Sequence, residues 1–119
     1  MTPADPANFW NYLDRLAAAC PVVIDRPRNT HHPRCPDIVY PLDYGYLDGT
    51  TSGDGGGIDV WLGTSGTREL SAVILTVDLY KRDAEIKILL GCSEEEIQTI
   101  FIFHNSNRMG ATLVRRPRS

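Results

Sequence analysis

The sequence is poor in the features that mark exported, membrane-spanning and nucleic-acid-binding proteins. It contains three cysteines, Cys20, Cys35 and Cys92, an odd number without the close spacing of a disulfide framework or a zinc site. It has no run of about 18 apolar residues, and it starts with a polar segment, so we expect neither a membrane span nor an export leader and predict a cytoplasmic protein. The net charge of −3 argues against a nucleic-acid partner, because such binding depends on neutralising phosphates.

The overall composition is that of one compact domain. Of the 119 residues, 42% are hydrophobic and 23% are charged, which suits a single modest core. We therefore expect one domain over residues 1–119, with an N-terminal helix within 1–19 and a barrel with a C-terminal helix over 21–114.

Residues 40–60 concentrate acidic and aromatic side chains in a glycine-rich segment. The segment holds three tyrosines and four aspartates, Asp43, Asp48, Asp54 and Asp59. Carboxylates that converge repel one another unless a cation lies between them, and Mg²⁺ takes oxygen ligands. Asp and Gly are also ordinary turn residues, an interpretation that is strongest for Asp48. The glycines between Asp54 and Asp59 favour a ligand site there, because they let the backbone approach a bound group closely.

A second acidic pair, Asp78 and Asp83, flanks a predicted hairpin loop. The apolar runs 70–77 and 84–90 on either side have the composition of strands. In a hairpin, Asp78 and Asp83 become cross-strand neighbours about 5 Å apart. Such a pair needs a cation or the basic residues of the loop to offset its charge. The alternative is a solvated hairpin tip with balanced charges.

These two motifs resemble those of the soluble (family I) inorganic pyrophosphatases. The family signature runs tyrosine, proline, any residue, asparagine, tyrosine, glycine, and later Asp-Gly-Asp-Pro-x-Asp-Val. This chain has Tyr40-Pro-Leu-Asp-Tyr-Gly45 and then Asp54-Gly-Gly-Gly-Ile-Asp-Val60. The family also carries a metal-binding aspartate pair at the separation of Asp78 and Asp83. The main departure is Gly56, which stands where the family has the aspartate credited with taking the proton from the attacking water.

The resemblance continues more loosely towards the N-terminus. Residues 21–27 are similar to a family strand that ends in a metal-binding glutamate, and Asp25 is its shorter counterpart. Arg34 stands where the family has a phosphate-binding lysine. A family hairpin that supplies a phosphate-binding arginine is missing before Tyr40, so its role is either lost or taken over by Arg26, Arg28 or Arg34.

The C-terminal part of the resemblance also shows substitutions. Glu85 replaces a family lysine, and Lys87 lies two residues further on the same strand face. His104 and Asn105 match a Tyr-Lys pair on the family's C-terminal helix.

Local patterns fit the fold that the resemblance implies. Residues 6–19 have the apolar spacing of an amphipathic helix, and Ser93 to Glu96 form a capping box that begins a second helix. We expect a buried strand at 21–24, a loop at 26–37, and further strands at 57–62, 70–77, 84–90 and 111–114. The predicted fold is mainly β with α (α+β), a small, partly open OB-like β-barrel with an N-terminal and a C-terminal helix.

The resemblance implies Mg²⁺-dependent hydrolysis of inorganic pyrophosphate by a metal-activated water, with Mn²⁺ as a second candidate cation. The implied metal ligands are Asp25, Asp54, Asp59, Asp78 and Asp83. The implied catalytic and phosphate-orienting residues are Arg34, Tyr44, Asp54, Lys87 and His104. Pyrophosphate is the expected small-molecule partner, and we expect a homo-oligomer without a nucleic-acid or membrane partner.

Two other functions remain open at this point. The chain could be a catalytically impaired relative that binds metal and phosphate or nucleotide as a sensor or subunit. It could also be a β-barrel that binds an oligonucleotide or a protein, with the aspartates serving only as turn residues.

Overall fold

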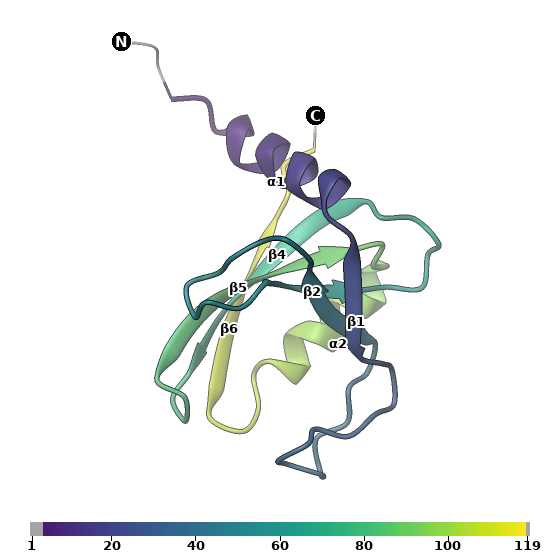
Figure 1. Cartoon of the computed structure of the whole chain (residues 1–119), viewed down its shortest axis with the longest axis vertical. Helices are drawn as coiled ribbons and strands as arrows, with labels where there is room; N and C mark the ends of the chain where they lie inside the picture. The colour runs from purple at the N-terminus through teal and green to yellow at the C-terminus, as the bar shows by residue number, and fades with distance from the viewer. Residues whose placement is uncertain (1–3, 119) are drawn as a thin grey trace.

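The computed structural model describes residues 4–118, in which two helices accompany a curled six-stranded sheet (Figure 1). The elements are α1 (Ala7–Ala19), β1 (Val22–Arg26), β2 (Asp43–Leu47), β3 (Ile58–Leu62), β4 (Leu70–Asp78), β5 (Asp83–Leu90), α2 (Glu94–Phe103) and β6 (Met109–Arg115). The strands lie in the order β1-β2-β3-β5-β4-β6, and β1 and β6 do not pair with each other within this part of the chain. The predicted α+β fold and partly open barrel are confirmed.

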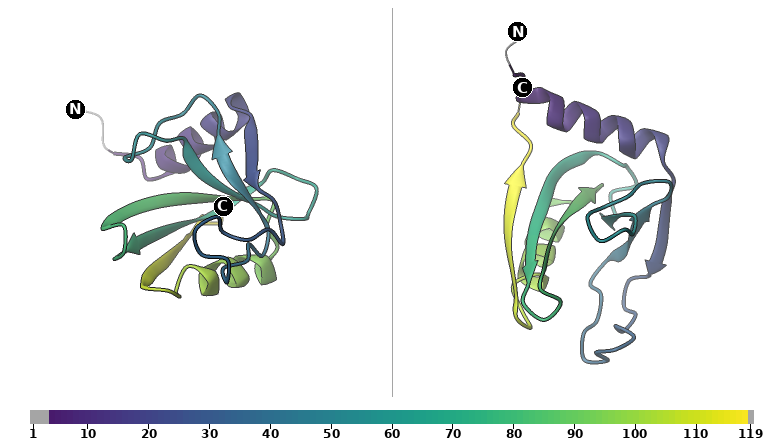
Figure 2. Two further views of the ribbon diagram at one scale, coloured as in Figure 1. Left: turned by 60° about the horizontal axis from the view of Figure 1, so that its bottom comes forward. Right: turned by 60° about the vertical axis from the view of Figure 1, so that its left-hand side comes forward.

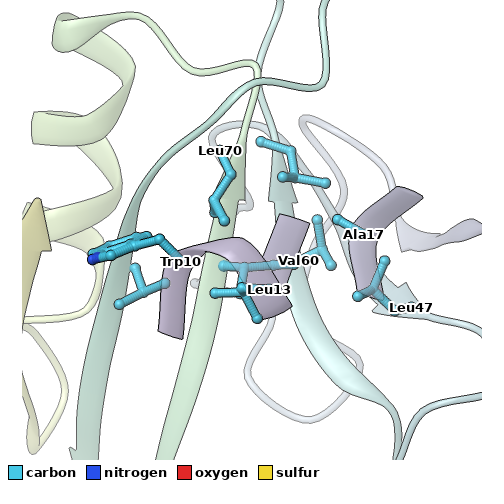
Figure 3. Packing of buried hydrophobic residues seen from close by; sticks show 9 residues of the cluster. Trp10, Leu13, Ala17, Leu47, Val60 and Leu70 are labelled. Atoms are coloured by element: carbon cyan, nitrogen blue, oxygen red, sulfur yellow. The ribbon is translucent and has the colours of Figure 1, made fainter. Parts of the chain in front are cut away.

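Helix α1 lies across one end of the curled sheet (Figures 1 and 2). Its buried residues Trp10, Leu13 and Ala17 follow the helical spacing expected from the sequence. They pack against strand residues such as Val60 and Leu70 to form one of two cores (Figure 3). The predicted helix at 6–19 is therefore confirmed to within one residue.

Helix α2 covers the opposite face of the central strands. Its predicted capping box is present, because the amide of Glu96 donates to Ser93 Oγ at 3.2 Å and the amide of Ser93 donates to Glu96 Oε1 at 2.9 Å. Ile97 and Ile100 are buried against Trp61 of β3 in a second core. Neighbouring strand residues alternate between the two cores, since successive side chains point to opposite faces of a sheet.

The first two strands differ from the prediction. The strand expected at 21–24 runs over Val22–Arg26, and it is half-buried rather than buried because it lies at the edge of the sheet. Strand β2 lies in the segment predicted to be rich in turns. Gly45 allows this strand to form, because a Cβ at Gly45 would come 1.8 Å from the carbonyl oxygen of Val23 on β1.

The predicted hairpin at 70–90 is confirmed, with Asp78 and Asp83 as register partners. Asp78 Oδ1 accepts hydrogen bonds from the amides of Tyr80 at 2.9 Å and Lys81 at 3.1 Å, which fixes the turn. Strands β3 and β5 are parallel, whereas every other neighbouring pair is antiparallel. No helix in the described part of the chain is long and apolar enough to cross a membrane.

Candidate active site

Three charged side chains form a row along one face of β5. Asp83, Glu85 and Lys87 are two residues apart, so they point to the same side of the sheet. Asp59 on β3 lies opposite Lys87, and Asp78 on β4 lies opposite Asp83. Asp59 of the first aspartate motif and the Asp78–Asp83 pair therefore lie along one face, at the two ends of a row about 13 Å long.

At the first end of the row, three oxygen atoms surround the ammonium group of Lys87. Its Nζ donates to Tyr44 OH at 2.7 Å, to Asp59 Oδ2 at 2.8 Å and to Glu85 Oε2 at 2.9 Å. Lys87 is only 5% exposed. An ammonium group has three N–H donors, so each of them is already used within the protein.

The electrostatics of this end favour a charged lysine and a neutral phenol. Burial alone would lower the pKa of Lys87, but Tyr44 and the Asp59 carboxylate beside the ammonium outweigh burial and raise it. Burial is also the main cause that raises the pKa of Tyr44, and it outweighs the opposing effect of Lys87. At neutral pH this end is therefore an ion-paired lysine with a protonated tyrosine as its third acceptor.

The second end of the row holds Asp78 and Asp83, which are register partners on β4 and β5. Burial and the neighbouring Glu85 raise the pKa of Asp83, and Asp78 contributes in the same direction. Lys81 in the hairpin loop opposes the shift, but the net direction remains upward. The ionised form of Asp83 is therefore less favourable than that of a carboxylate in water.

Asp54 lies in the exposed loop between β2 and β3. Its Oδ1 accepts hydrogen bonds from Ser52 Oγ at 2.6 Å and from the amide of Gly56 at 2.9 Å. These bonds, with a smaller contribution from Glu85, lower the pKa of Asp54. Asp54 is therefore an ionised turn residue close enough to the row to interact with Glu85.

A basic group lies on the loop between β1 and β2 and around it. Burial lowers the pKa of His32, and the nearby charges of Arg26, Lys81 and Arg34 lower it further. Arg34 is exposed, and its backbone amide donates to His32 Nδ1 at 3.0 Å. The structure thus gathers three cationic side chains from the β1 strand, the following loop and the hairpin tip.

His104 lies inside the second core. It is 3% exposed, and its Nε2 accepts a hydrogen bond from Trp61 Nε1 at 2.9 Å. Burial, and to a smaller extent Lys87, lowers the pKa of His104 to about 3. His104 is therefore a neutral acceptor at pH 7 that holds Trp61 in place.

The other predicted site residues are more dispersed. Asp25 is exposed and lies in the bulge of edge strand β1. Asp43 accepts a hydrogen bond from the amide of Arg28 at 2.8 Å and orders the start of the long loop. Over residues 4–118, no group of three or more His, Cys, Asp or Glu side chains is arranged as a metal-holding cluster.

A cleft of about 670 Å³ does not coincide with the carboxylate row. Its wall includes Leu75, Val77, Ala84 and Ile86, which alternate along the hairpin with the residues of the row. These side chains therefore point to the other face of the hairpin, and only Asp59 and Glu85 belong to both features.

The sequence interpretation missed the role of Glu85 and the contact between Tyr44 and Lys87. The two-residue spacing of Asp83, Glu85 and Lys87 was a signal that all three share a strand face. The partners on β2 and β3 carried no local signal, because their position depends on a parallel strand pairing between distant segments.

The fold is similar to that of several solved inorganic pyrophosphatases. The enzyme from Neisseria gonorrhoeae aligns over 75% of this chain and 77% of its own length, with 16% identity and a TM-score of 0.59. The enzyme from Coxiella burnetii aligns over 77% and 81%, with 16% identity and a TM-score of 0.55. The enzyme from Helicobacter pylori aligns over 79% and 81%, with 15% identity and a TM-score of 0.54.

These likenesses establish the fold, and the fold agrees with the resemblance of the sequence motifs. Neither a protein-family model nor a curated protein sequence matches the chain. The chain thus has a fold similar to that of these inorganic pyrophosphatases, at a sequence identity of only 15–16% to the three enzymes named above.

Proposed function

We propose that the protein is a divergent soluble inorganic pyrophosphatase, a Mg²⁺-dependent hydrolase that splits pyrophosphate into two orthophosphates. The observation that supports this most is the placement of Asp59 and the Asp78–Asp83 pair along one charged row, within the fold of the pyrophosphatases. A cytoplasmic location and a homo-oligomeric state remain predictions.

Asp78 and Asp83 are the residues that fit a divalent cation best. Their donors are carboxylate oxygens, the type that Mg²⁺ and Mn²⁺ prefer, and burial with the nearby carboxylates of Glu85 and Asp78 raises the pKa of Asp83. Glu85 follows Asp83 on the same strand face and adds negative charge, and Asp54 interacts with Glu85. A bound cation would neutralise phosphate oxygens and lower the pKa of a coordinated water.

The basic group of Arg26, Arg34 and Lys81 is the proposed phosphate-binding side of the site. Arginine holds phosphate oxygens with two parallel hydrogen bonds and keeps its charge at any physiological pH. In the reaction a water oxygen bonds to one phosphorus, and the bridging oxygen leaves with the other phosphate. Charge neutralisation by these side chains would favour the departure of that phosphate. Lys87 and His104 are proposed to position the site rather than to contact phosphate, because their polar atoms are engaged inside the protein.

The loss of a carboxylate at Gly56 predicts slow turnover. A general base contributes about 10²- to 10⁴-fold to a rate. A Cβ at Gly56 would lie 3.3 Å from Asp54 Oδ1, so a side chain can be accommodated there with a small shift.

The test is orthophosphate release from pyrophosphate with Mg²⁺, with Mn²⁺ and with chelator. We expect cation-dependent release by the wild type and a rise of at least about tenfold for Gly56→Asp. Gly53→Asp is the matched control, because it places the same side chain in the same loop where no atom lies within 4 Å. Release that is insensitive to chelator, or equal rises in both variants, would contradict the proposal.

A second candidate function is that of a non-catalytic relative that binds metal and phosphate. Two observations favour it: Gly56 carries no base, and Lys87 already engages Asp59. Tight pyrophosphate binding in the presence of Mg²⁺, without turnover in the wild type or in Gly56→Asp, would support it.

A further inference from the structure

The ammonium of Lys87 has the surroundings of a bound cation. It lies between the carboxylates of Asp59 and Glu85, at 2.8 and 2.9 Å, and the hydroxyl of Tyr44 completes its shell at 2.7 Å. The side chain of Lys87 is 7% exposed, and those of Asp59 and Glu85 are 26% and 14% exposed. This is a largely desolvated, fully hydrogen-bonded ion group, rather than a surface lysine that can swing away.

We infer that Lys87 acts as a built-in replacement for a metal ion at Asp59 and Glu85, so that only the Asp78–Asp83 end of the row is free to bind a divalent cation. This inference deepens the proposed function, because it concerns which residues of the same site bind metal. It also differs from what the motif resemblance implies for Asp59, which is a metal ligand there.

The charges of the row support an ammonium at one end and a free cation site at the other. Asp59 and Glu85 each have an ion-pair partner in Lys87, whereas Asp78 uses one carboxylate oxygen to hold backbone amides of the hairpin turn. A divalent cation placed at Asp59 would have to approach the buried ammonium, and like charges at such distances repel strongly in a desolvated site. The ammonium has no other group to move to without losing three hydrogen bonds.

The aromatic rings beside the ammonium of Lys87 are also held in place. Lys87 Nζ lies 5.3 Å from the centre of the Tyr44 ring, and that ring lies 4.7 Å from the ring of Trp61. Trp61 is in turn fixed by its hydrogen bond to His104. The position of the ammonium is therefore set by the second core, independently of any bound metal.

The test is the number of Mn²⁺ ions bound per chain, measured with the metal alone by calorimetry and by the electron paramagnetic resonance of free Mn²⁺. Lys87→Met removes the ammonium but keeps most of the apolar stem, and we expect it to bind one Mn²⁺ more than the wild type. Lys81→Met is the matched control, because Lys81 is the other lysine of the chain and acts on Asp83 from an exposed position. We expect Lys81→Met to bind Mn²⁺ somewhat more tightly, without an additional ion.

A second variant covers the case in which Lys87→Met does not fold without metal. Lys87→Met/Asp59→Asn removes one charge of each sign, so it should fold and bind no additional Mn²⁺. If Lys87→Met is unfolded in chelator, we expect Mn²⁺ to restore its circular dichroism spectrum and to raise its melting temperature more than that of the wild type.

Equal Mn²⁺ stoichiometry in Lys87→Met and Lys81→Met, or an additional ion in the double variant, would overturn the inference. A wild type that binds no Mn²⁺ and releases no phosphate would contradict the proposed function instead. The inference would then still be supported if Lys87→Met gained a Mn²⁺ ion that the wild type lacks.

Discussion

The two ends of the charged row contain similar carboxylates in different electrostatic situations. At one end, Asp59 and Glu85 share the buried ammonium of Lys87, and every charge has a partner. At the other end, Asp83 is the register partner of Asp78, and burial together with Glu85 raises the pKa of Asp83. The difference shows that acidic residues on one strand face can have different surroundings, since Asp59 and Glu85 share an ammonium whereas Asp83 has no such partner among the described ion pairs.

The two ends of the row also differ in how they affect the stability of the protein. A compensated buried ion group contributes to a defined structure, and removing one partner is costly because it leaves the other charges unpaired. An uncompensated carboxylate pair costs stability and is retained where it has a function. Under the proposed function, the Lys87 end would position the site and the Asp78–Asp83 end would take part in catalysis.

The largest effect on stability is expected for Lys87→Met. In chelator, this change leaves Asp59 and Glu85 without their cation and should lower the free energy of unfolding by about 3–5 kcal/mol. Urea denaturation measures the loss. Lys81→Met, in the hairpin loop, should change stability by less than about 0.5 kcal/mol. Similar losses in the two variants would show that the two ends do not differ as described.

A smaller effect on the free energy of unfolding is expected from the titration of His104, which accepts the hydrogen bond of Trp61. Its pKa is about 3 in the folded protein against an ordinary value of 6.5, so the unfolded chain binds the proton more readily. The stability that neutral His104 contributes is fully present above pH 6.5 and is lost as the pH falls towards 3. The loss amounts to about 1.4 kcal/mol per pH unit.

His104→Gln isolates this effect, because glutamine can still accept the hydrogen bond of Trp61 but does not titrate. Between pH 7 and pH 5, the wild type should lose about 2 kcal/mol more unfolding free energy than His104→Gln. Urea denaturation at both pH values measures the difference. Parallel losses in the two proteins would show that His104 is not held neutral.

The smallest effect is expected for Tyr44→Phe. The change removes the one uncharged acceptor of Lys87 and should cost about 1 kcal/mol. Tyr80→Phe, at a position that is 84% exposed, is the control and should be neutral. A loss as large as that of Lys87→Met would mean that the tyrosine, and not the two carboxylates, stabilises the ammonium.

The parts of the fold with strong local patterns were predictable. The apolar spacing of α1, the capping box of α2 and the long hairpin all appear where the sequence indicates them. The register of Asp78 and Asp83 followed from the length of their loop. Strand β2 was missed because Gly45 and its tyrosine neighbours have the composition of a turn, and only the close approach of β1 explains the glycine.

The pairing of side chains along the charged row could not be predicted from the sequence. Asp59 and Lys87 meet through the parallel pairing of β3 with β5, which joins segments 28 residues apart without a local signal. His104 was expected to face phosphate, whereas its partner Trp61 lies 43 residues away in the chain. Contacts of this kind depend on the tertiary arrangement and cannot be derived from spacing alone.

The most direct test of the account compares orthophosphate release from pyrophosphate with Mg²⁺ by the wild type, Asp83→Asn and Asp59→Asn. Both variants remove one negative charge from the same row, but from its two different ends. We predict release by the wild type, a loss of at least about 100-fold in Asp83→Asn and a loss of less than about tenfold in Asp59→Asn. An inactive wild type, or a loss in Asp59→Asn as large as that in Asp83→Asn, would contradict the account.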